Sequence, residues 1–193
     1  MNWDTAALIL IDFQQGMDDP SLGPRNNPDA ECNAARMLAE WRRAGRPLIH
    51  VQHMSTESNS VFRPGRAGNA LKPIVAPQPG ETLIQKTVSS AFIGTDLEQR
   101  LRSAGIDTLI FAGMQTDLCV SSTARMAGNL GFTVYVVNDA TATFDRPGVG
   151  GQVYSAALVH DVTLASLHNE FATVVMTSDI LPPVAAEPAS HGS

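Results

Sequence analysis

Short apolar runs alternate along the chain with longer stretches in which apolar residues recur every three or four positions. A short, almost continuous apolar run is typical of a strand buried on both faces, and the longer spacing is typical of a helix packed against a sheet. Strands are therefore predicted at Ala6–Phe13, Pro47–Gln52, Thr82–Lys86, Ile106–Ala112, Phe132–Val137 and Ala172–Met176. Helices are predicted at Pro28–Ala44, Asp117–Asn129 and Gln152–Leu167, and from Thr95, which forms a capping-box pattern with Glu98.

Strands that alternate with helices in this way indicate βαβ units, in which consecutive strands run parallel. The predicted fold class is α/β: a three-layer αβα sandwich with a mostly parallel six-stranded sheet and helices on both faces. We expect one domain over residues 1–181 and a flexible or partner-contacting C-terminal tail over residues 182–193. Residues 54–80, rich in proline and glycine, are expected to form a long irregular loop that serves as a lid, a pocket wall or an interface.

The charge balance and the composition exclude several classes of protein. The 193 residues include 13 Lys and Arg against 19 Asp and Glu, a net charge of -6, and no basic run that would neutralise nucleic-acid phosphates. The longest aliphatic stretch, Ala6–Ile11, has six residues, whereas a membrane-spanning helix needs about 20. The first residues lack the basic region of a secretory signal, and two cysteines cannot build a disulfide framework. We therefore expect a cytoplasmic protein that binds neither nucleic acid nor membrane.

Candidate chemistry follows from where reactive side chains fall relative to the predicted strands. Ligands of parallel α/β sheets bind beyond the carboxyl ends of the strands. Asp12 lies at the end of the first predicted strand, Lys86 at the end of the third, and Cys119 in the first turn of a helix, where the helix dipole favours a thiolate. Each has an ordinary structural alternative: a capping carboxylate, a surface lysine and a packed cysteine. Together they would form a nucleophile with a base and an electrostatic partner.

Four segments carry a resemblance to a known superfamily: ALILIDFQ (Ala7–Gln14), KTVSSAFIGTDLEQRL (Lys86–Leu101), GMQTDLCVSSTARMAGNLGF (Gly113–Phe132) and VVNDATAT (Val136–Thr143). With them the chain resembles the isochorismatase-like cysteine hydrolases, which include nicotinamidases and N-carbamoylsarcosine amidases, over residues 6–181. The resemblance implies that Asp12, Lys86 and Cys119 form the catalytic triad. It also implies an oxyanion hole made by the backbone N–H groups of Gln115 and Cys119, beside a cis peptide bond between Met114 and Gln115.

The implied activity is hydrolysis of the C–N bond of a small amide, carbamoyl or ureido compound through a thioester on Cys119. One alternative is an isochorismatase-type vinyl-ether hydrolase; because that reaction needs no nucleophile, the presence of Cys119 favours C–N hydrolysis. The other alternative is a non-catalytic relative that senses or binds through its thiol. Members of this superfamily are usually oligomers, so a homo-oligomer, dimer or higher, is expected.

The resemblance also bears on metals and on substrate contacts. Nicotinamidases of this superfamily bind a metal through an Asp and two His after the second strand, but no Asp occurs here between Val51 and Leu71. His50 and His53 alone make a weak site, so we expect no metal and no other cofactor. Positions near the triad or in the irregular loop supply candidate contacts to a small-molecule substrate: Phe13, Gln14, His53, Arg63 and Phe92, with Arg66 and Lys72 as further loop cations.

Overall fold

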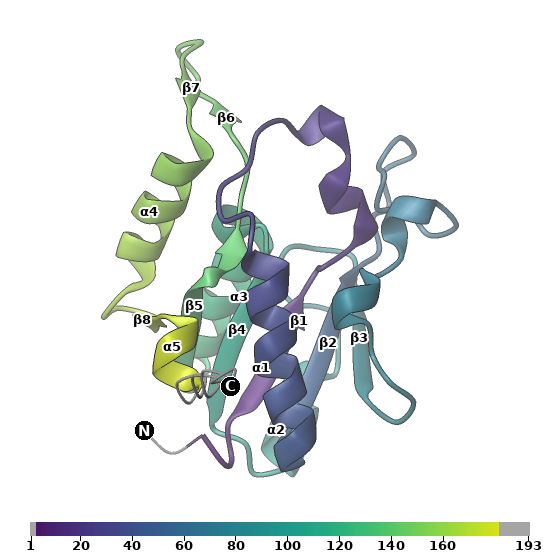
Figure 1. The fold of residues 1–193 in the computed structure, drawn as a ribbon, viewed down its shortest axis with the longest axis vertical. Coiled ribbons are helices and arrows are strands. Elements are labelled where there is room, and N and C mark those ends of the chain that lie inside the picture. The colour runs from purple at the N-terminus through teal and green to yellow at the C-terminus, as the bar shows by residue number, and fades with distance from the viewer. Residues whose placement is uncertain (1–2, 182–193) are drawn as a thin grey trace, which may run out of the picture.

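Six parallel strands form the central sheet of the computed structural model, which describes residues 3–181. The strands are β1 (Ala7–Ile11), β2 (Leu48–His53), β3 (Thr82–Lys86), β4 (Thr108–Met114), β5 (Thr133–Ala142) and β8 (Thr173–Val175). Their order across the sheet is β3-β2-β1-β4-β5-β8, and all five neighbouring pairs are parallel (Figure 1). The predicted α/β class and six-stranded parallel sheet are confirmed.

Helices cover both faces of this sheet (Figure 1). Side chains of β1 alternate between the two cores, with Leu8 and Leu10 on one face and Ile9 and Ile11 on the other. On the Leu8 face lie α1 (Ala30–Ala44) and α5 (Thr177–Ile180); on the Ile9 face lie α2 (Leu97–Ser103), α3 (Ser121–Asn129) and α4 (Ala156–Leu167). The three-layer αβα arrangement follows from this division.

Helix α1 shows how the sequence pattern is used in packing. Ala34, Met37, Leu38 and Trp41 recur at helical spacing, and all four are buried against the sheet. The Trp41 indole N–H donates to the carbonyl of Ala6 at 3.1 Å, so the buried ring keeps a hydrogen-bond partner. The helix begins at residue 30 and not at residue 28 as predicted, a shift of the size expected for helix ends.

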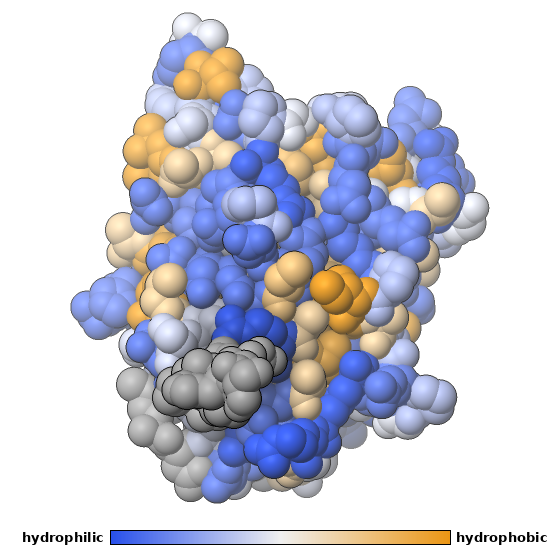
Figure 2. Space-filling model, in the orientation of Figure 1, coloured by the Kyte–Doolittle hydropathy of each residue, from blue (hydrophilic) through white to orange (hydrophobic). Residues whose placement is uncertain are grey.

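Two further predicted helix starts differ from the structure. Residues 152–155 do not begin a helix, because residues 146–154 form a small hairpin of β6 (Arg146–Pro147) and β7 (Val153–Tyr154). Helix α4 starts only after Ser155, whose hydroxyl accepts the N–H of Leu158 at 3.3 Å. Val149 and Val153 of this hairpin are exposed, and the space-filling view shows a small hydrophobic patch near its tip (Figure 2).

The capping box predicted for Thr95 and Glu98 is also absent. The Thr95 hydroxyl donates to the carbonyl of Ala91 at 2.5 Å and accepts the N–H of Leu97 at 3.3 Å, while Glu98 pairs with Arg102 at 3.5 Å. Helix α2 therefore starts at Leu97, two residues later than predicted.

The segment between β2 and β3 is irregular, as predicted. Short 3-10 turns at Ala67–Asn69 and Pro73–Val75 interrupt it, and it lies beside the carboxyl ends of the neighbouring strands (Figure 1). The predicted tail over residues 182–193 lies outside the described residues. Between residues 3 and 181, no helix is long and apolar enough to cross a membrane.

Candidate active site

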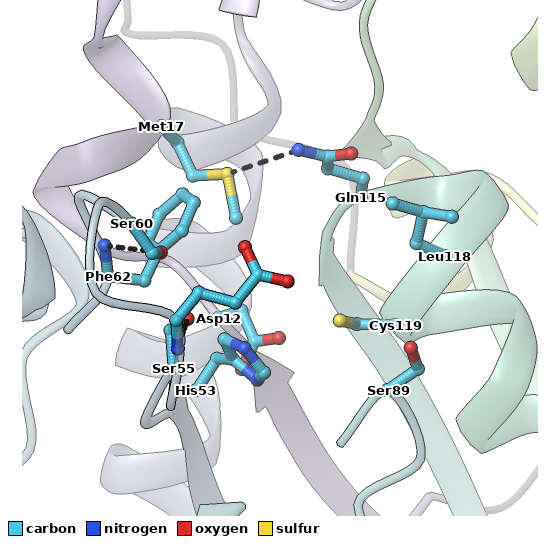
Figure 3. A pocket seen from close by; sticks show the side chains of 11 residues that line it. Asp12, Met17, His53, Ser55, Ser60, Phe62, Ser89, Gln115, Leu118 and Cys119 are labelled. Carbon is cyan, nitrogen blue, oxygen red and sulfur yellow. Dashed lines mark hydrogen bonds between the residues drawn. The ribbon is translucent and has the colours of Figure 1, made fainter. Parts of the chain in front are cut away.

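The three predicted triad residues meet at the carboxyl edge of the sheet. Strand β1 lies between β2 and β4, so the crevice where the chain changes direction across the sheet opens beside the end of β1. Asp12 follows β1, Lys86 ends β3, and Cys119 lies in a π-helical turn, Thr116–Val120, that links β4 to α3. Asp12 and Cys119 line a cavity of about 290 Å³ at this point (Figure 3).

Lys86 connects the other two members of this group. Its Nζ lies 2.6 Å from Oδ2 of Asp12 and 3.2 Å from Sγ of Cys119. The side chains of Lys86 and Asp12 are both 0% exposed, so the ion pair is shielded from water. A buried charge of either sign is costly alone, which makes each of these two groups depend on the other.

His53 is the fourth polar group of this cluster. Its Nδ1 lies 3.4 Å from Nζ of Lys86, and its ring lines the cavity (Figure 3). Burial, and then the positive charge of Lys86, lower the pKa of His53. The imidazole is therefore neutral at pH 7, and its Nδ1 lone pair faces the ammonium.

Burial controls the protonation of the thiol and the carboxylate. It raises the pKa of Cys119 to about 12, with the negative charge of Asp12 as the next cause and Lys86 acting in the opposite direction. Burial also raises the pKa of Asp12, against the opposing effect of Lys86. The resting site thus holds a thiol, not the thiolate expected from the helix position, because desolvation outweighs the helix dipole. Among residues 3–181, Oδ1 of Asp12 is buried without a hydrogen-bond partner, so it is available to take a proton.

The segment that follows β4 positions Cys119. The peptide bond between Met114 and Gln115 is cis, and Gln115 lines the cavity beside Cys119. The buried hydroxyl of Thr116 lies 2.9 Å from Nδ1 of His160, whose Nε2 lies 2.8 Å from Oδ1 of Asn138. These contacts tie the cysteine turn to α4 and β5.

The cavity has further lining residues that the sequence did not single out. They come from the segment after β1, from the irregular segment between β2 and β3, and from the loops around Cys119, and they are Met17, Ser55, Glu57, Ser60, Phe62, Ser89 and Leu118. The strand-end rule could not find them, because none lies at the end of a strand. Their positions show that part of the 54–80 segment is a wall of the cavity.

Four predicted substrate contacts lie elsewhere in the structure, whereas His53 does line the cavity. Phe13 is buried in the core under α1, on the face of Leu8 and Leu10, because the φ of +52° at Asp12 interrupts the alternation of side chains along β1. Gln14 is buried, and its side-chain amide bonds backbone groups: it accepts the N–H of His53 at 3.0 Å and donates to the Asn69 carbonyl at 2.8 Å. Phe92 packs near Phe132, with 5.8 Å between ring centroids.

The loop cations are also away from the cavity lining. Arg63 is exposed, and Arg66 donates to the carbonyl of Ser58 at 3.1 Å. Lys72 is buried, with its ammonium 2.6 Å from both Asp18 and Glu31. The two carboxylates compensate the charge of Lys72 within the fold, and its side chain does not line the cavity.

His50 and His53 lie on different sides of the sheet. His50 is buried and its Nε2 lies 2.9 Å from Oε2 of Glu81, far along β2 from the cavity end. In the part of the chain that the structure describes, no group of three or more His, Cys, Asp and Glu side chains is arranged to hold a metal ion.

Known proteins resemble this chain over nearly its whole length. The Isochorismatase domain model matches residues 6–179. The chain is 45% identical over 175 residues to the uncharacterized isochorismatase family protein YrdC of Bacillus subtilis, covering 91% of this chain and 94% of that one. It is 29% identical over 192 residues to maleamate amidohydrolase of Pseudomonas putida, covering 91% and 84%. The crystal structure of a putative hydrolase of the isochorismatase family from Chromobacterium violaceum superposes with a TM-score of 0.90 at 49% identity, covering 93% of each chain. The chain is a member of the isochorismatase family of hydrolases.

Proposed function

We propose that this protein is a metal-independent cysteine hydrolase that cleaves the C–N bond of a small amide, carbamoyl or ureido compound. The observation that supports the proposal most directly is the position of Lys86, whose Nζ lies 2.6 Å from Asp12 and 3.2 Å from Cys119. A nucleophile, a base and a fixed positive charge then share one small cavity. This combination suits attack on a carbonyl carbon.

In the first half-reaction, Asp12 removes the proton of the Cys119 thiol as the sulfur attacks the carbonyl carbon. A C–S bond forms, and the carbonyl π electrons move onto oxygen to give a tetrahedral oxyanion. The backbone N–H groups of Gln115 and Cys119 are the donors proposed for this oxyanion. Loss of one such donor typically raises the barrier by about 2.7–4 kcal/mol. A base is needed because burial raises the pKa of Cys119 to about 12.

Collapse of the oxyanion then breaks the C–N bond. Asp12 returns its proton to the departing nitrogen, so the amine or ammonia leaves neutral and a thioester remains on Cys119. Water enters, gives a proton to Asp12 and attacks the thioester carbonyl, and the C–S bond breaks. The sulfur recovers the proton, so an acid is released and the thiol is restored.

Lys86 holds the carboxylate and the sulfur in place throughout this sequence. As an ammonium it stabilises the charged form of Asp12 and the negative charge that develops on sulfur. His53 supports the same ammonium with its neutral Nδ1. Among the relatives, a protein named maleamate amidohydrolase supports an amide as the substrate class.

Ammonia release from a panel of small amides, carbamoyl and ureido compounds tests the proposal, with and without a metal chelator. We expect release from at least one member of the panel, unaffected by the chelator. Loss of activity with the chelator would contradict metal independence. Pyruvate release from isochorismate, with no ammonia from any amide, would instead indicate vinyl-ether hydrolysis.

The cytoplasmic location and the homo-oligomeric state stay predictions. Light scattering of the purified 193-residue chain measures its mass in solution. A value near the 20.5 kDa of one chain would contradict an oligomer.

A further inference from the structure

Gln115 carries a side-chain amide into the cavity that the proposed reaction does not use. The residue is 8% exposed and lies directly after β4, beside Cys119 in the cavity lining. Its amide nitrogen points across the cavity toward Met17 (Figure 3).

Arg146 fixes the orientation of this amide. The guanidinium of Arg146 donates to Oε1 of Gln115, and its Nε donates to Oδ2 of Asp117 at 2.8 Å. Asp117 also accepts the hydroxyl of Thr143, which helps to hold the carboxylate that anchors Arg146. Because an arginine has only donors, the amide oxygen must face it, and the amide nitrogen must face the cavity.

The amide nitrogen lacks a strong acceptor in the described part of the chain. It contacts Sδ of Met17 at 4.0 Å, and a thioether is a weak acceptor. A buried N–H donor without a good partner is destabilising, so the arrangement favours a ligand that supplies one.

We propose that the Gln115 amide nitrogen donates to a second carbonyl oxygen of the substrate, away from the scissile bond, and that Arg146 is the residue that positions it. The inference rests on the proposed function, since it names a feature of the same substrate: a small amide that carries another carbonyl group. Glu57 also lines the cavity, so a neutral carbonyl is favoured over a carboxylate, which its negative charge would repel.

Protection of Cys119 from a thiol reagent tests this without requiring turnover. In a Cys32→Ser background, methyl methanethiosulfonate modifies Cys119 alone, and intact mass follows the rate. Succinamide and 4-methylpentanamide compete for the cavity; they have nearly the same shape, but only succinamide carries a second carbonyl. We expect succinamide to protect at about tenfold lower concentration, the effect of one well-made hydrogen bond. Equal protection by the two compounds would overturn the proposal.

Variants of Gln115 and Arg146 test whether these two residues cause the preference for succinamide. Gln115→Glu has the same shape but places an oxygen where the N–H donor was, so the protection ratio should fall to about one or below. Arg146→Met should lower the ratio, and Arg146→Lys, which keeps a donor, should recover part of it. Gln99→Glu, on the exposed surface of α2, is the matched control and should keep the wild-type ratio. A ratio unchanged in Gln115→Glu would overturn the assignment.

The proposed function is measured separately, by ammonia release from succinamide. A protection ratio near ten, without ammonia release from succinamide or any other member of the panel, would contradict the hydrolytic function and support the binding role. Ammonia release with a ratio near one would support the hydrolase and overturn the role of Gln115.

Discussion

The ammonium of Lys86 lies 2.6 Å from the carboxylate of Asp12, and neither side chain is exposed to water. The two residues are 74 positions apart in the sequence and come from strands that are not neighbours, since β2 lies between β1 and β3. Such a pair holds two strand ends at a fixed separation. The charge of Lys86 also opposes the rise that burial causes in the pKa of Asp12, and so favours the carboxylate that serves as the base of the proposed reaction.

The dependence of each charge on the other predicts the effect of Lys86→Met. Removing the ammonium leaves the Asp12 carboxylate buried without its partner, which should lower the free energy of unfolding by about 3–5 kcal/mol. Urea denaturation measures this loss. The double variant Asp12→Asn/Lys86→Met should recover part of it, and Arg100→Met, in a half-exposed ion pair with Asp96, should have little effect. Equal urea midpoints for wild type and Lys86→Met would rule out a structural dependence.

Asp12→Asn should separate thiol reactivity from turnover. The charge of Asp12 is one cause of the raised pKa of Cys119, so its removal should lower that pKa and speed alkylation at pH 8. Hydrolysis should nevertheless fall by about 10²–10⁴, because the general base is lost. Both rates can be measured in the Cys32→Ser background. Slower alkylation together with unchanged ammonia release would be the opposite of what the geometry requires.

Gly113→Ala should prevent stable folding. Gly113 has a φ of +152°, and a Cβ there would lie 2.2 Å from the carbonyl oxygen of Ile11 on the neighbouring strand. Because both backbones belong to the central sheet, neither can move aside, and we expect a loss of at least about 4 kcal/mol. Gly131→Ala is the control: φ is +83°, but nothing lies within 4 Å, so only about 1–2 kcal/mol should be lost. Thermal denaturation of the two variants side by side measures both losses, and equal losses would contradict the clash at Gly113.

Glu81→Gln should weaken the fold at neutral pH and much less in acid. Hydrogen bonds from the Arg42 guanidinium lower the pKa of Glu81 most, and hydrogen bonds from the N–H of Gln78 and from His50 lower it further. The pKa falls from 4.5 to about 2. A lowered carboxyl pKa stabilises the folded state above pH 4.5, and this stabilisation is lost as the pH falls toward 2. The urea midpoints of wild type and variant should therefore converge between pH 5 and pH 2.

The control for this experiment is Glu98→Gln. Glu98 pairs with Arg102 at 3.5 Å, and both side chains are nearly half exposed. Its urea midpoint should follow that of the wild type at every pH. A gap between wild type and Glu81→Gln that stays constant down to pH 2 would contradict the role given to the Glu81 carboxylate.

The sequence predicted the sheet because its strands carry a strong local signal. The run that forms β1 is buried on both faces, so its residues are almost all apolar and stand out against the helices. Helix starts were less well predicted, since residues 146–154 form a hairpin whose two short strands have no distinctive pattern. Thr95 matched a capping box, yet its hydroxyl donates to the carbonyl of Ala91, a local contact within the turn that precedes α2.

The candidate site was likewise predicted only in part. Asp12, Lys86 and Cys119 could be found from strand ends and from the superfamily resemblance, because the fold brings such positions to one edge. Phe13, expected to contact substrate, lies in the core under α1, because the positive φ of Asp12 interrupts the alternation of side chains along β1. Glu57 and Arg146 were missed because they reach the site from loops and a hairpin, and no local pattern records which long-range contact a loop residue makes.

The central claim is that hydrolysis proceeds through the sulfur of Cys119. Its most direct test is the rate of ammonia release by Cys119→Ala beside wild type, with Cys32→Ala as the control for loss of an exposed cysteine that does not line the cavity. Circular dichroism should show the same fold in all three proteins. We predict that Cys119→Ala loses at least about 10³-fold in rate while Cys32→Ala keeps the wild-type rate. An unchanged rate in Cys119→Ala, with the same substrate, would contradict the covalent mechanism.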